Sequence, residues 1–313
     1  MNIGVIGYRR HALNHINYAS KTFGFENIKI FHPYKKIKGL TNEFQSLLNC
    51  DCIIISSPTN THLFYIKKLI SNNYKGYIYL EKPGFSSLEE SFELEKLQLE
   101  NNLNITIGYH YPYEKKIKRI LEILDEQNTG EIISLDIKIA KGISYSKWFK
   151  EDWRNKDKLA IAHTVLSHAI SIFYFLTNSN DDKQIKTKVF YNHKNKTFDN
   201  SLAISSDKKP LLKAIASWGS PLIDDRLDII TTNSLISLEN NILTVRAPRE
   251  TFNSEGLFST PNISLSEKFQ TKGIEPSLES FFEACNKKSL FNKNIFKQSL
   301  SIGRLCFSSE IVY

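Results

Sequence analysis

The sequence is poor in the residues that mark several common protein classes. Its 313 residues include four cysteines, Cys50, Cys52, Cys285 and Cys306, and none of them forms a Cys-x-x-Cys pair. This argues against a disulfide scaffold or a zinc module and favours reduced, buried thiols. No run of about 18 apolar residues is present, so no transmembrane helix is expected. With 13 glycines and 9 prolines, the chain is neither fibrous nor of low complexity.

The amino terminus and the charge balance bear on location and partners. Arg9 and Arg10 follow the first apolar stretch, whereas a secretory signal carries its basic residues before it, so we expect a cytoplasmic protein. The net charge of +8 comes from scattered lysines, and the densest basic run, residues 114–119, is typical of a solvated helix face. Because no nucleic-acid module accompanies this charge, we expect neither nucleic acid nor a membrane as a partner.

Short apolar runs alternate with helical stretches over the first 110 residues. Five apolar runs predict strands, at residues 3–6, 28–31, 51–56, 77–80 and 105–107. Three helical patterns lie between them, at residues 11–23, 62–70 and 88–100. This alternation predicts an α/β domain over residues 1–112, with a doubly wound parallel sheet. Such sheets bind ligands beyond the carboxyl ends of their strands.

The alternation of strands and helices stops after residue 112, which predicts a second domain, residues 113–313. A helix at residues 113–125 leads to an alternating strand at 131–140, and another helix covers about 163–176. Six further strands are predicted, at residues 185–192, 201–206, 211–218, 226–232, 234–239 and 242–247. They indicate an open, mostly antiparallel sheet in an α+β domain. Two amphipathic helices, 277–285 and 294–313, close the chain and are expected to cover a flank or an end of the first domain.

The turn after the first predicted strand nearly matches a dinucleotide-binding fingerprint. Gly7 and Ala12 occupy the first and third glycine positions, but Arg9 occupies the middle one, where a glycine lets the backbone approach the pyrophosphate. The helix N-terminus still offers N–H groups to a phosphate, and Arg9 or Arg10 can add charged hydrogen bonds. An ordinary strand-turn-helix is the alternative interpretation.

The second predicted strand ends in a basic cluster. His32 stands where an NAD site usually places an acid for the ribose hydroxyls, and Lys35 and Lys36 follow it. Positive charge suits a ribose 2'-phosphate, so the cluster favours NADP slightly over NAD. Solvated loop lysines are the alternative.

Polar residues also follow the third and fourth predicted strands. The third is followed by Ser57, Pro58, Asn60 and His62 within the stretch SSPTNTH. The fourth ends in Glu81-Lys82-Pro83. A lysine at the carboxyl end of a parallel strand faces the ligand crevice, where it can bond substrate and cofactor ribose, although a lysine taken singly is more often a surface residue.

A polar stripe interrupts the apolar helix at residues 163–176. Thr164, His168 and Ser171 lie at i, i+4 and i+7, so they share one face of a mostly buried element. Buried polar groups need partners, which indicates a cavity, whereas a satisfied core histidine is the alternative. His163 lies about 140° around an α-helix from His168, so the two do not share a metal on one face, and we expect no metal.

Six stretches, in their order and spacing, resemble the Gfo/Idh/MocA family of NAD(P)-dependent oxidoreductases: GVIG, SSPTNTH, LEKP, GYHYPYEK, DWRNKDKLA and HTVLSHAIS. The EKP triplet with the preceding P-x-x-x-H is the most specific. The resemblance implies an N-terminal Rossmann domain and a C-terminal domain whose open sheet mediates homodimer or homotetramer formation. It also implies hydride transfer between NAD or NADP and a carbinol carbon of a sugar, a cyclitol or a nucleotide-linked sugar.

The resemblance also assigns roles to residues. The catalytic lysine is Lys82 and the catalytic histidine is His168, while the position of the family's aspartate holds Thr164. The preceding glycines are replaced by residues 160–162, Ala-Ile-Ala. The cofactor is assigned to Gly7, Arg9, Arg10, Ala12, His32, Ser57, Pro58, Asn60, His62, Glu81 and Lys82. The substrate is assigned to Tyr109, His110, Trp153, Arg154, Thr164 and His168.

Two function classes follow. In the first, the chain is a dehydrogenase or reductase in which His168 accepts the hydroxyl proton and Lys82 polarises the developing carbonyl, while Trp153 and Arg154 contact an acidic substrate group. A structural role for Trp153 is equally consistent with the sequence. In the second, the chain is a catalytically decayed relative that binds a nucleotide or sugar as a sensor, an interpretation favoured by Arg9, Thr164 and the missing glycines.

Overall fold

The computed structural model describes residues 1–35, 39–126, 129–179, 185–205, 210–221, 223–247, 254–257, 261–270 and 273–313, except for the side chain of Arg10. Lys36 of the predicted basic cluster therefore lies outside the described residues. The chain divides into two compact units. Unit 1 contains Met1–Tyr111 and Lys272–Arg304, and unit 2 contains Pro112–Thr271 and Leu305–Tyr313.

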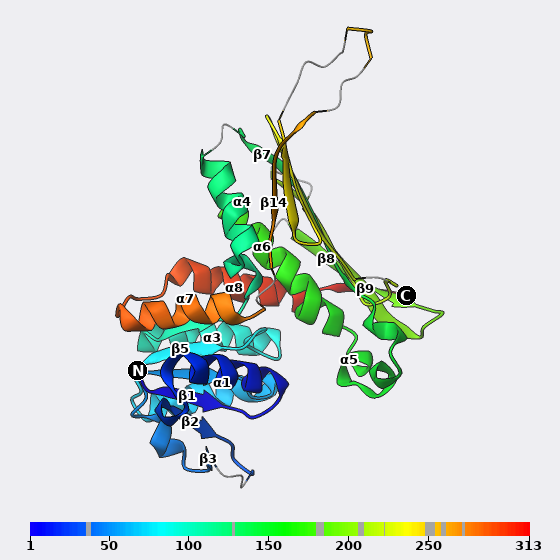
Figure 1. Ribbon diagram of the computed structural model, residues 1–313. Coiled ribbons are helices and arrows are strands. Elements are labelled where there is room, and N and C mark those ends of the chain that lie inside the picture. The colour runs from blue at the N-terminus through cyan, green and yellow to red at the C-terminus, as the bar shows by residue number, and fades with distance from the viewer. Residues whose placement is uncertain are drawn as a thin grey trace. The chain divides into compact units, whose positions relative to one another are not determined.

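Unit 1 is built on a parallel sheet (Figure 1). Over the described residues it has six strands in the order β3-β2-β1-β4-β5-β6. Their bounds are Ile3–Ile6 (β1), Ile28–Phe31 (β2), Leu40–Thr41 (β3), Cys52–Ile55 (β4), Tyr77–Leu80 (β5) and Asn104–Ile107 (β6). Every residue of β1 and β4 is buried, which explains why these strands are continuous apolar runs instead of alternating ones. The predicted doubly wound sheet is confirmed.

The helices of unit 1 include one pair from the end of the chain. The helices are Arg10–Phe23 (α1), His62–Ser71 (α2), Leu88–Asn101 (α3), Glu275–Asn286 (α7) and most of Lys293–Phe307 (α8). The sequence predicted one cut at residue 112, whereas the structure groups Lys272–Arg304 with unit 1. The reason is the apolar face of α7, which needs an apolar partner.

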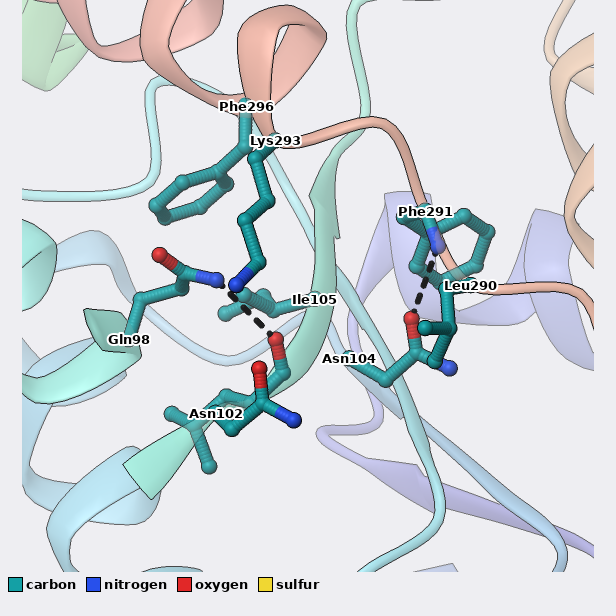
Figure 2. A pocket seen from close by; sticks show the side chains of 9 residues that line it. Gln98, Asn102, Asn104, Ile105, Leu290, Phe291, Lys293 and Phe296 are labelled. Carbon is teal, nitrogen blue, oxygen red and sulfur yellow. Dashed lines mark hydrogen bonds between the residues drawn. The ribbon is translucent and has the colours of Figure 1, made fainter. Parts of the chain in front are cut away.

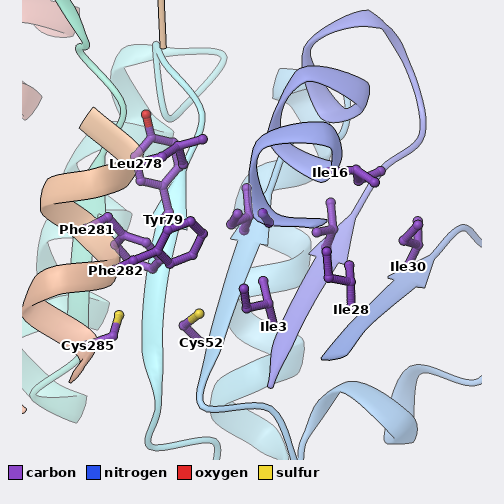
Figure 3. Packing of buried hydrophobic residues seen from close by; sticks show 13 residues of the cluster. Ile3, Ile16, Ile28, Ile30, Cys52, Tyr79, Leu278, Phe281, Phe282 and Cys285 are labelled. Carbon is purple, nitrogen blue, oxygen red and sulfur yellow. The ribbon is translucent and has the colours of Figure 1, made fainter. Parts of the chain in front are cut away.

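The face of the unit 1 sheet under α1 and α7 forms a continuous core (Figure 3). Leu278, Phe281 and Phe282 of α7 pack with Tyr79 of β5, and Ile16 of α1 packs over the same face. Phe281 lies edge-on against Tyr79, with ring centroids 5.3 Å apart. Each of these apolar side chains gains about 1.5–3 kcal/mol on burial, which holds α7 on a sheet formed nearly 200 residues earlier.

Unit 2 contains a broad open sheet (Figure 1). Its nine strands, counted over the described residues, have the order β14-β13-β12-β11-β7-β10-β9-β8-β15. The bounds are Ile132–Lys141 (β7), Ile185–Asn192 (β8), Thr197–Ser205 (β9), Leu211–Ser217 (β10), Ile223–Thr231 (β11), Leu235–Glu239 (β12), Ile242–Arg246 (β13), Ile263–Lys268 (β14) and Glu310–Val312 (β15). Two pairs, β7 with β10 and β8 with β15, are parallel and the others antiparallel, so the predicted mostly antiparallel sheet is confirmed.

Helices cover one face of the unit 2 sheet. Lys115–Glu126 (α4) and Ser167–Thr177 (α6) lie along it in Figure 1, and α6 contacts β7 and β10. The short helix Trp153–Lys156 (α5) follows β7. Along β9, buried side chains alternate with partly exposed ones, so the partly exposed side chains lie on the other face. The unit therefore has one packed face and one open face.

The closing helix is shorter than the sequence predicted. It was expected to run to residue 313, but α8 ends at Phe307 and Glu310–Val312 pair with β8 as a parallel strand. The prediction of a helix was wrong at this end. The three residues of the strand follow Ser308-Ser309, and three residues are too few for hydrophobic periodicity to distinguish a strand from a helix. Within the ranges that the structure describes, no helix has the length and apolar character that a membrane crossing needs.

The first prediction concerns α7. Leu278→Ala removes a fully buried side chain from the core under α7 and should lower the free energy of unfolding by about 2–5 kcal/mol. Chemical denaturation followed by circular dichroism measures this change. Glu279→Ala, on the exposed side of the same helix, is the matched control and should change stability by less than about 0.5 kcal/mol. Equal effects of both substitutions would contradict the packing of α7 on the sheet.

Candidate active site

The turn between β1 and α1 requires a glycine at its first position. Gly7 has φ +119°, and a Cβ atom there would lie 2.5 Å from the carbonyl oxygen of Ser56. Its N–H donates to the carbonyl of Phe31, 3.1 Å away, so the turn is held between the neighbouring strands β2 and β4. A side chain at Gly7 would force this contact apart. The residue therefore performs the tight-turn role that the fingerprint assigns to its first glycine.

Arg9 sits at the rim of the same turn. It is the N-cap residue of α1, its backbone is extended with φ −125°, and its side chain is exposed. Ala12, at the third position of the fingerprint, is completely buried against the sheet. The first turn of α1 contains no acidic residue, so its N–H groups and the positive end of its dipole have no acidic side chain from that turn beside them. This arrangement suits a phosphate even without the middle glycine.

A basic cluster surrounds the end of β2. The Nδ1 atom of His32 accepts the backbone N–H groups of Tyr34 and Lys35, at 3.2 and 3.1 Å. Burial, together with the charges of Lys35 and Arg9, lowers the pKa of His32. The Lys35 ammonium lies 5.4 Å from the ring centroid of Tyr8, directly after Gly7. The structure thus brings Arg9, His32 and Lys35 together beside the β1–α1 turn.

The segment after β4 folds into a tight turn that begins α2. The hydroxyl groups of Ser57 and Thr61 are 2.7 Å apart, and Thr61 also donates to the carbonyl of Pro58. His62 lies under this turn, fully buried, with Nε2 2.9 Å from the carbonyl of Ser57, and burial lowers its pKa. The neutral imidazole therefore supports the turn from below, while Pro58 and Asn60 are exposed on it.

The end of β5 carries a buried carboxylate beside Lys82. Oε1 of Glu81 lies 2.6 Å from Nε2 of His15, a fully buried residue of α1. Burial opposes the ionisation of Glu81, but the hydrogen bond and charge of His15, with the charges of His11 and Lys82, outweigh it and lower the Glu81 pKa to about 2. Lys82 itself is half-buried. Sequence reasoning missed His15, although it lies eight residues after Gly7 on the helix that the fingerprint begins.

The end of β6 adds two aromatic residues to this edge. Tyr109 is buried, and its N–H donates to the carbonyl of Ile107 at 2.8 Å. His110 is half-buried, with its ring centroid 4.9 Å from that of Tyr111. Strand direction places the carboxyl ends of parallel strands at the same edge of the sheet. The segments that follow β1, β2, β4, β5 and β6 therefore all begin at this edge.

A pocket in unit 1 lies away from this edge (Figure 2). It is small and open to solvent, and it is lined by Gln98, Asn104, Phe291 and Lys293 among others. Asn104 begins β6, so the pocket is at the amino ends of the strands. Asn104 accepts the backbone N–H of Phe291 at 2.9 Å, and Gln98 donates to the carbonyl of Leu103 at 3.3 Å. The first bond joins the segment before α8 to the sheet, and the second joins α3 to the residue before β6, so both polar side chains have a structural role.

In unit 2, His168 follows an irregular helical turn. Ala162–Leu166 form a π-helical turn directly before α6, and the Ser167 N–H donates to the carbonyl of Ala162 five residues earlier. The predicted uniform α-helix over residues 163–176 is therefore wrong in its first turn. Because a π-turn is wider, the angle of about 140° between His163 and His168, which assumed an α-helix, does not apply. Single π-turns inside α-helices are frequent at functional sites.

The predicted polar stripe is bonded largely to its own helix. The Thr164 hydroxyl donates to the carbonyl of Ala160, and the Ser171 hydroxyl donates to the carbonyl of His168 at 2.7 Å. His168 is 6% exposed and Thr164 is half-buried. A hydroxyl committed to a backbone carbonyl cannot stabilise an imidazolium as a carboxylate would. Thr164 thus does not replace the charge of the family's aspartate.

A second buried histidine lies beside the predicted substrate residues. His163 Nε2 is 2.7 Å from Oδ2 of Asp157, and its ring stacks between Trp153 and Phe307, at centroid distances of 6.0 and 5.2 Å. The guanidinium of Arg154 bonds Asp152 at 2.8 Å and lies 5.0 Å from the Trp153 ring. Trp153 and Arg154 are therefore tied into unit 2 by these contacts, which favours the structural interpretation of Trp153.

No metal centre emerges from the part of the chain that the structure describes. Within it, no three His, Cys, Asp or Glu side chains gather closely enough to hold a metal ion. The four cysteines are buried and free. Cys52 and Cys285 face each other in the core under α7, where their mutual contact and burial raise the pKa of Cys52.

Comparison with known proteins shows a family to which part of the chain is similar. Residues 1–109 match the model of the Gfo/Idh/MocA oxidoreductase family, described as having an NAD-binding Rossmann fold. Residues 1–109 are therefore similar to the Rossmann domain of this family. The resemblance inferred from the motifs is thereby confirmed, and the matched range contains Gly7, the His32 cluster, the Ser57–His62 turn and Lys82.

A curated relative matches part of the chain, and two solved structures match the fold of nearly all of it. The uncharacterized oxidoreductase YrbE of Bacillus subtilis is 32% identical over 101 residues, which are 30% of this chain and 29% of that protein. UDP-N-acetylglucosamine 3-dehydrogenase GnnA from Acidithiobacillus ferrooxidans has a TM-score of 0.73 at 16% identity, over 97% of this chain and 95% of that one. A levoglucosan dehydrogenase in complex with NADH and levoglucosan has a TM-score of 0.77 at 13% identity, over 98% and 95%. These two structures share the fold of both units of this chain.

The second prediction concerns the β1–α1 turn. Gly7→Ala places a methyl group against the Ser56 carbonyl in a backbone conformation that alanine rarely adopts, so it should abolish binding of a nicotinamide dinucleotide. Calorimetric titration measures this binding. Gly256→Ala is the matched control, since Gly256 also has a positive φ but a Cβ atom there would meet nothing within 4 Å, and it should leave the affinity unchanged. Retained affinity in a folded Gly7→Ala protein would contradict the assignment of this turn.

Proposed function

We propose that the chain is an NAD(P)-dependent oxidoreductase that transfers a hydride to or from a carbinol or carbonyl carbon of a sugar, a cyclitol or a nucleotide-linked sugar. The observation that carries the proposal is the edge of unit 1, where the Gly7 turn, the N-terminus of α1 and Lys82 follow parallel strands. The substrate class is supported by GnnA and the levoglucosan dehydrogenase, which act on a nucleotide-linked sugar and a sugar derivative by their names.

The residues of unit 1 fit a nicotinamide dinucleotide. The Gly7 turn leaves room that a Cβ would fill, and the N–H groups of α1 offer a phosphate site. Arg9, Arg10 and Ala12 border that site, Ser57, Pro58, Asn60 and His62 form or support the next turn, and Glu81 and Lys82 follow β5. When bound, the dinucleotide supplies the hydride acceptor or donor.

Lys82 and His168 carry the proton chemistry in this proposal. The Lys82 ammonium donates a hydrogen bond to the substrate oxygen and stabilises the charge that develops on it. The imidazole of His168 takes the hydroxyl proton during oxidation and returns it during reduction. Tyr109, His110, Trp153, Arg154 and Thr164 are proposed to contact the substrate. Arg154 would reach an acidic group while it keeps Asp152 as its intramolecular partner.

A decayed relative that serves as a sensor is the second candidate. The observation that favours it is the Thr164 hydroxyl, which bonds the Ala160 carbonyl and offers no charge to a histidine. A sensor would bind the dinucleotide and a sugar without turnover. The presence of both Lys82 and His168 favours the enzyme.

The open face of the unit 2 sheet supports a proposed homo-oligomer, either a homodimer or a homotetramer. Partly exposed apolar residues such as Ile204 and Ile230 lie on this face with ion pairs such as Lys213–Asp136. Mixed surfaces of this kind are typical of protein interfaces. The cytoplasmic location stays a prediction of the sequence.

The third prediction tests the reaction. Lys82→Ala and His168→Ala should each lower turnover by about 10²- to 10⁴-fold without unfolding the protein, because each removes a group that acts on the reacting oxygen. The reaction is tested with a panel of free and nucleotide-linked sugars. It is followed by the absorbance at about 340 nm, where the reduced nicotinamide absorbs and the oxidised form does not. Dinucleotide binding without hydride transfer to any of them would favour the sensor.

The fourth prediction concerns the choice of cofactor. We propose a modest preference for NADP, since Arg9 and Lys35 lie near His32 beside the β1–α1 turn and present positive charge to a ribose 2'-phosphate. Lys35→Glu should reverse the preference by weakening NADP binding about tenfold or more and leaving NAD binding nearly unchanged. Lys29→Glu, which changes an exposed lysine within β2, is the control. Tighter binding of NAD than of NADP by the unmodified protein would contradict this proposal.

A further inference from the structure

The turn that follows β2 is built around the imidazole of His32. Nδ1 of His32 accepts the backbone N–H of Tyr34 at 3.2 Å and that of Lys35 at 3.1 Å. A side-chain acceptor that bonds N–H groups two and three residues later is the device by which aspartate and asparagine close turns and begin helices. Pro33, with its fixed φ, favours the same turn. His32 therefore takes the place of a short polar side chain.

Contacts from β3 hold both ends of this turn. The His32 N–H donates to the carbonyl of Thr41 at 3.1 Å. The side-chain amide of Asn42, directly after β3, donates to the carbonyl of His32 at 2.6 Å and to that of Lys35 at 3.3 Å. The backbone of Lys35 is thus bonded through its N–H to the imidazole and through its carbonyl to Asn42.

The same turn sets the position of the Lys35 side chain. Its ammonium lies 5.4 Å from the ring centroid of Tyr8, within the range of a cation–π contact. Because Tyr8 directly follows Gly7, Lys35 brings its charge from the end of β2 to the β1–α1 turn. Lys35 is exposed, and a cation–π contact at an exposed site is weak. The backbone of the turn therefore has to hold the lysine in this place.

The two bonds to Nδ1 fix the protonation state of His32. An imidazole nitrogen that accepts N–H groups carries no proton, so the ring is neutral and its proton is on Nε2. A proton on Nδ1 would face two N–H donors at close range. Protonation of His32 therefore breaks both bonds of the turn.

The neighbours of the ring also disfavour a proton. Among the described residues, the charges that act on it are those of Lys35 on the same turn and Arg9 at the start of α1, and both are cations. Partial burial and these two charges lower the pKa of His32. The Tyr34 ring lies edge-on to the imidazole, with centroids 6.4 Å apart, and is uncharged near neutral pH. The residues that contact the turn from β3 are uncharged as well.

We propose that neutral His32 is a positioning residue that holds Lys35 beside the β1–α1 turn for a ribose 2'-phosphate, and that a proton on His32 releases the lysine. The inference rests on the NADP preference in the proposed function. Lys35 supplies the charge that distinguishes NADP from NAD, and His32 supplies the turn that aims it. The preference for NADP should therefore be greatest at neutral pH and fall in acid.

The competing explanation is a direct contact, in which an imidazolium at His32 itself binds the phosphate. The two explanations predict opposite effects of a proton on His32. A cationic His32 ligand would strengthen NADP binding as the pH falls, whereas the positioning role loses the lysine under the same conditions. The phosphate itself also titrates, with a second pKa of about 6, so a variant that cannot titrate at position 32 is the necessary reference.

Three variants provide the reference and the controls. His32→Asn keeps the acceptor, because Oδ1 of asparagine and Nδ1 of histidine are both bonded to Cγ, and it has no proton to gain. His32→Leu fills similar space and removes the acceptor. His193→Asn changes an exposed histidine of unit 2 and is the matched control.

The first measurement follows His32 without any ligand. In the ¹⁵N-labelled full chain, the ring ¹⁵N shifts show which nitrogen carries the proton, and His32→Asn identifies the signals of His32. At neutral pH Nδ1 should be unprotonated. As the pH falls, the backbone amide shifts of Tyr34 and Lys35 should move with the same midpoint as the ring.

The second measurement is the affinity for NADP and for NAD, by calorimetric titration from about pH 8 to about one unit below the His32 midpoint. The ratio of the two dissociation constants isolates the 2'-phosphate, since NAD has every other group. Relative to His32→Asn, the preference of the unmodified protein for NADP should fall in acid by about tenfold, which is the contribution of one charged hydrogen bond. His32→Leu should lose it at every pH, and His193→Asn should match the unmodified protein.

Lys35→Ala tests whether His32 acts through the lysine. If it does, His32→Leu should weaken NADP binding about tenfold in the unmodified background and less than about twofold in Lys35→Ala. A direct phosphate contact by His32 would cost the same in both backgrounds.

The outcomes distinguish this inference from the proposed function. A proton on Nδ1 at neutral pH, a preference for NADP that stays constant or rises in acid relative to His32→Asn, or an equal effect of His32→Leu in both backgrounds overturns the positioning role. Ring and amide shifts that move together in a protein that binds neither dinucleotide support the hold of His32 on Lys35 and contradict the proposed function. Coupled shifts with a preference that falls in acid support both.

Discussion

Burial of a parallel sheet on both faces is the constraint on which unit 1 depends. Parallel strands need crossover connections, which place helices on both faces of the sheet, so every residue of β1 and β4 is buried. On the face that α1 covers, the helices connecting the strands leave part of the sheet unburied. Leu278, Phe281 and Phe282 of α7 cover that part. Because the strands run parallel, their carboxyl ends lie at one edge of the sheet. Gly7, His32, Ser57 and Lys82 gather there for that reason.

The electrostatics of this edge combine exposed cations with one buried anion. Arg9 and Lys35 lie near His32 at the end of β2, where their positive charge suits phosphate groups. Glu81 is ionised behind them because His15 outweighs the cost of burial. Since the Glu81 pKa falls from 4.5 to about 2 on folding, its contribution to stability is present above the ordinary pKa and is lost as the pH falls toward 2. The pair therefore stabilises the edge throughout the neutral range.

Local patterns predicted most elements of both units to within a few residues. The runs at 3–6, 28–31 and 77–80 have the same bounds as β1, β2 and β5 because burial on both faces makes them plainly apolar. The strand β14 was missed because it is largely exposed and has only two apolar residues, Ile263 and Leu265. The π-turn before His168 was missed as well, since one wide turn barely alters hydrophobic periodicity. The bonds of Thr164 and Ser171 to their own helix lay outside sequence reasoning for the same reason.

By itself, the sequence determined the strand-helix alternation, the Gly7 turn, the EKP triplet and the family to which they point, because each depends on residues close together in the chain. Only the tertiary structure decided that α7 belongs with unit 1, that His15 pairs with Glu81 across 66 positions, and that Arg9 and Lys35 flank His32. These features depend on side chains from distant segments meeting in a nearly water-free interior or at a shared sheet edge. Hydrophobic pattern determines which faces are buried, but not which buried polar groups meet, as His15 and Glu81 do.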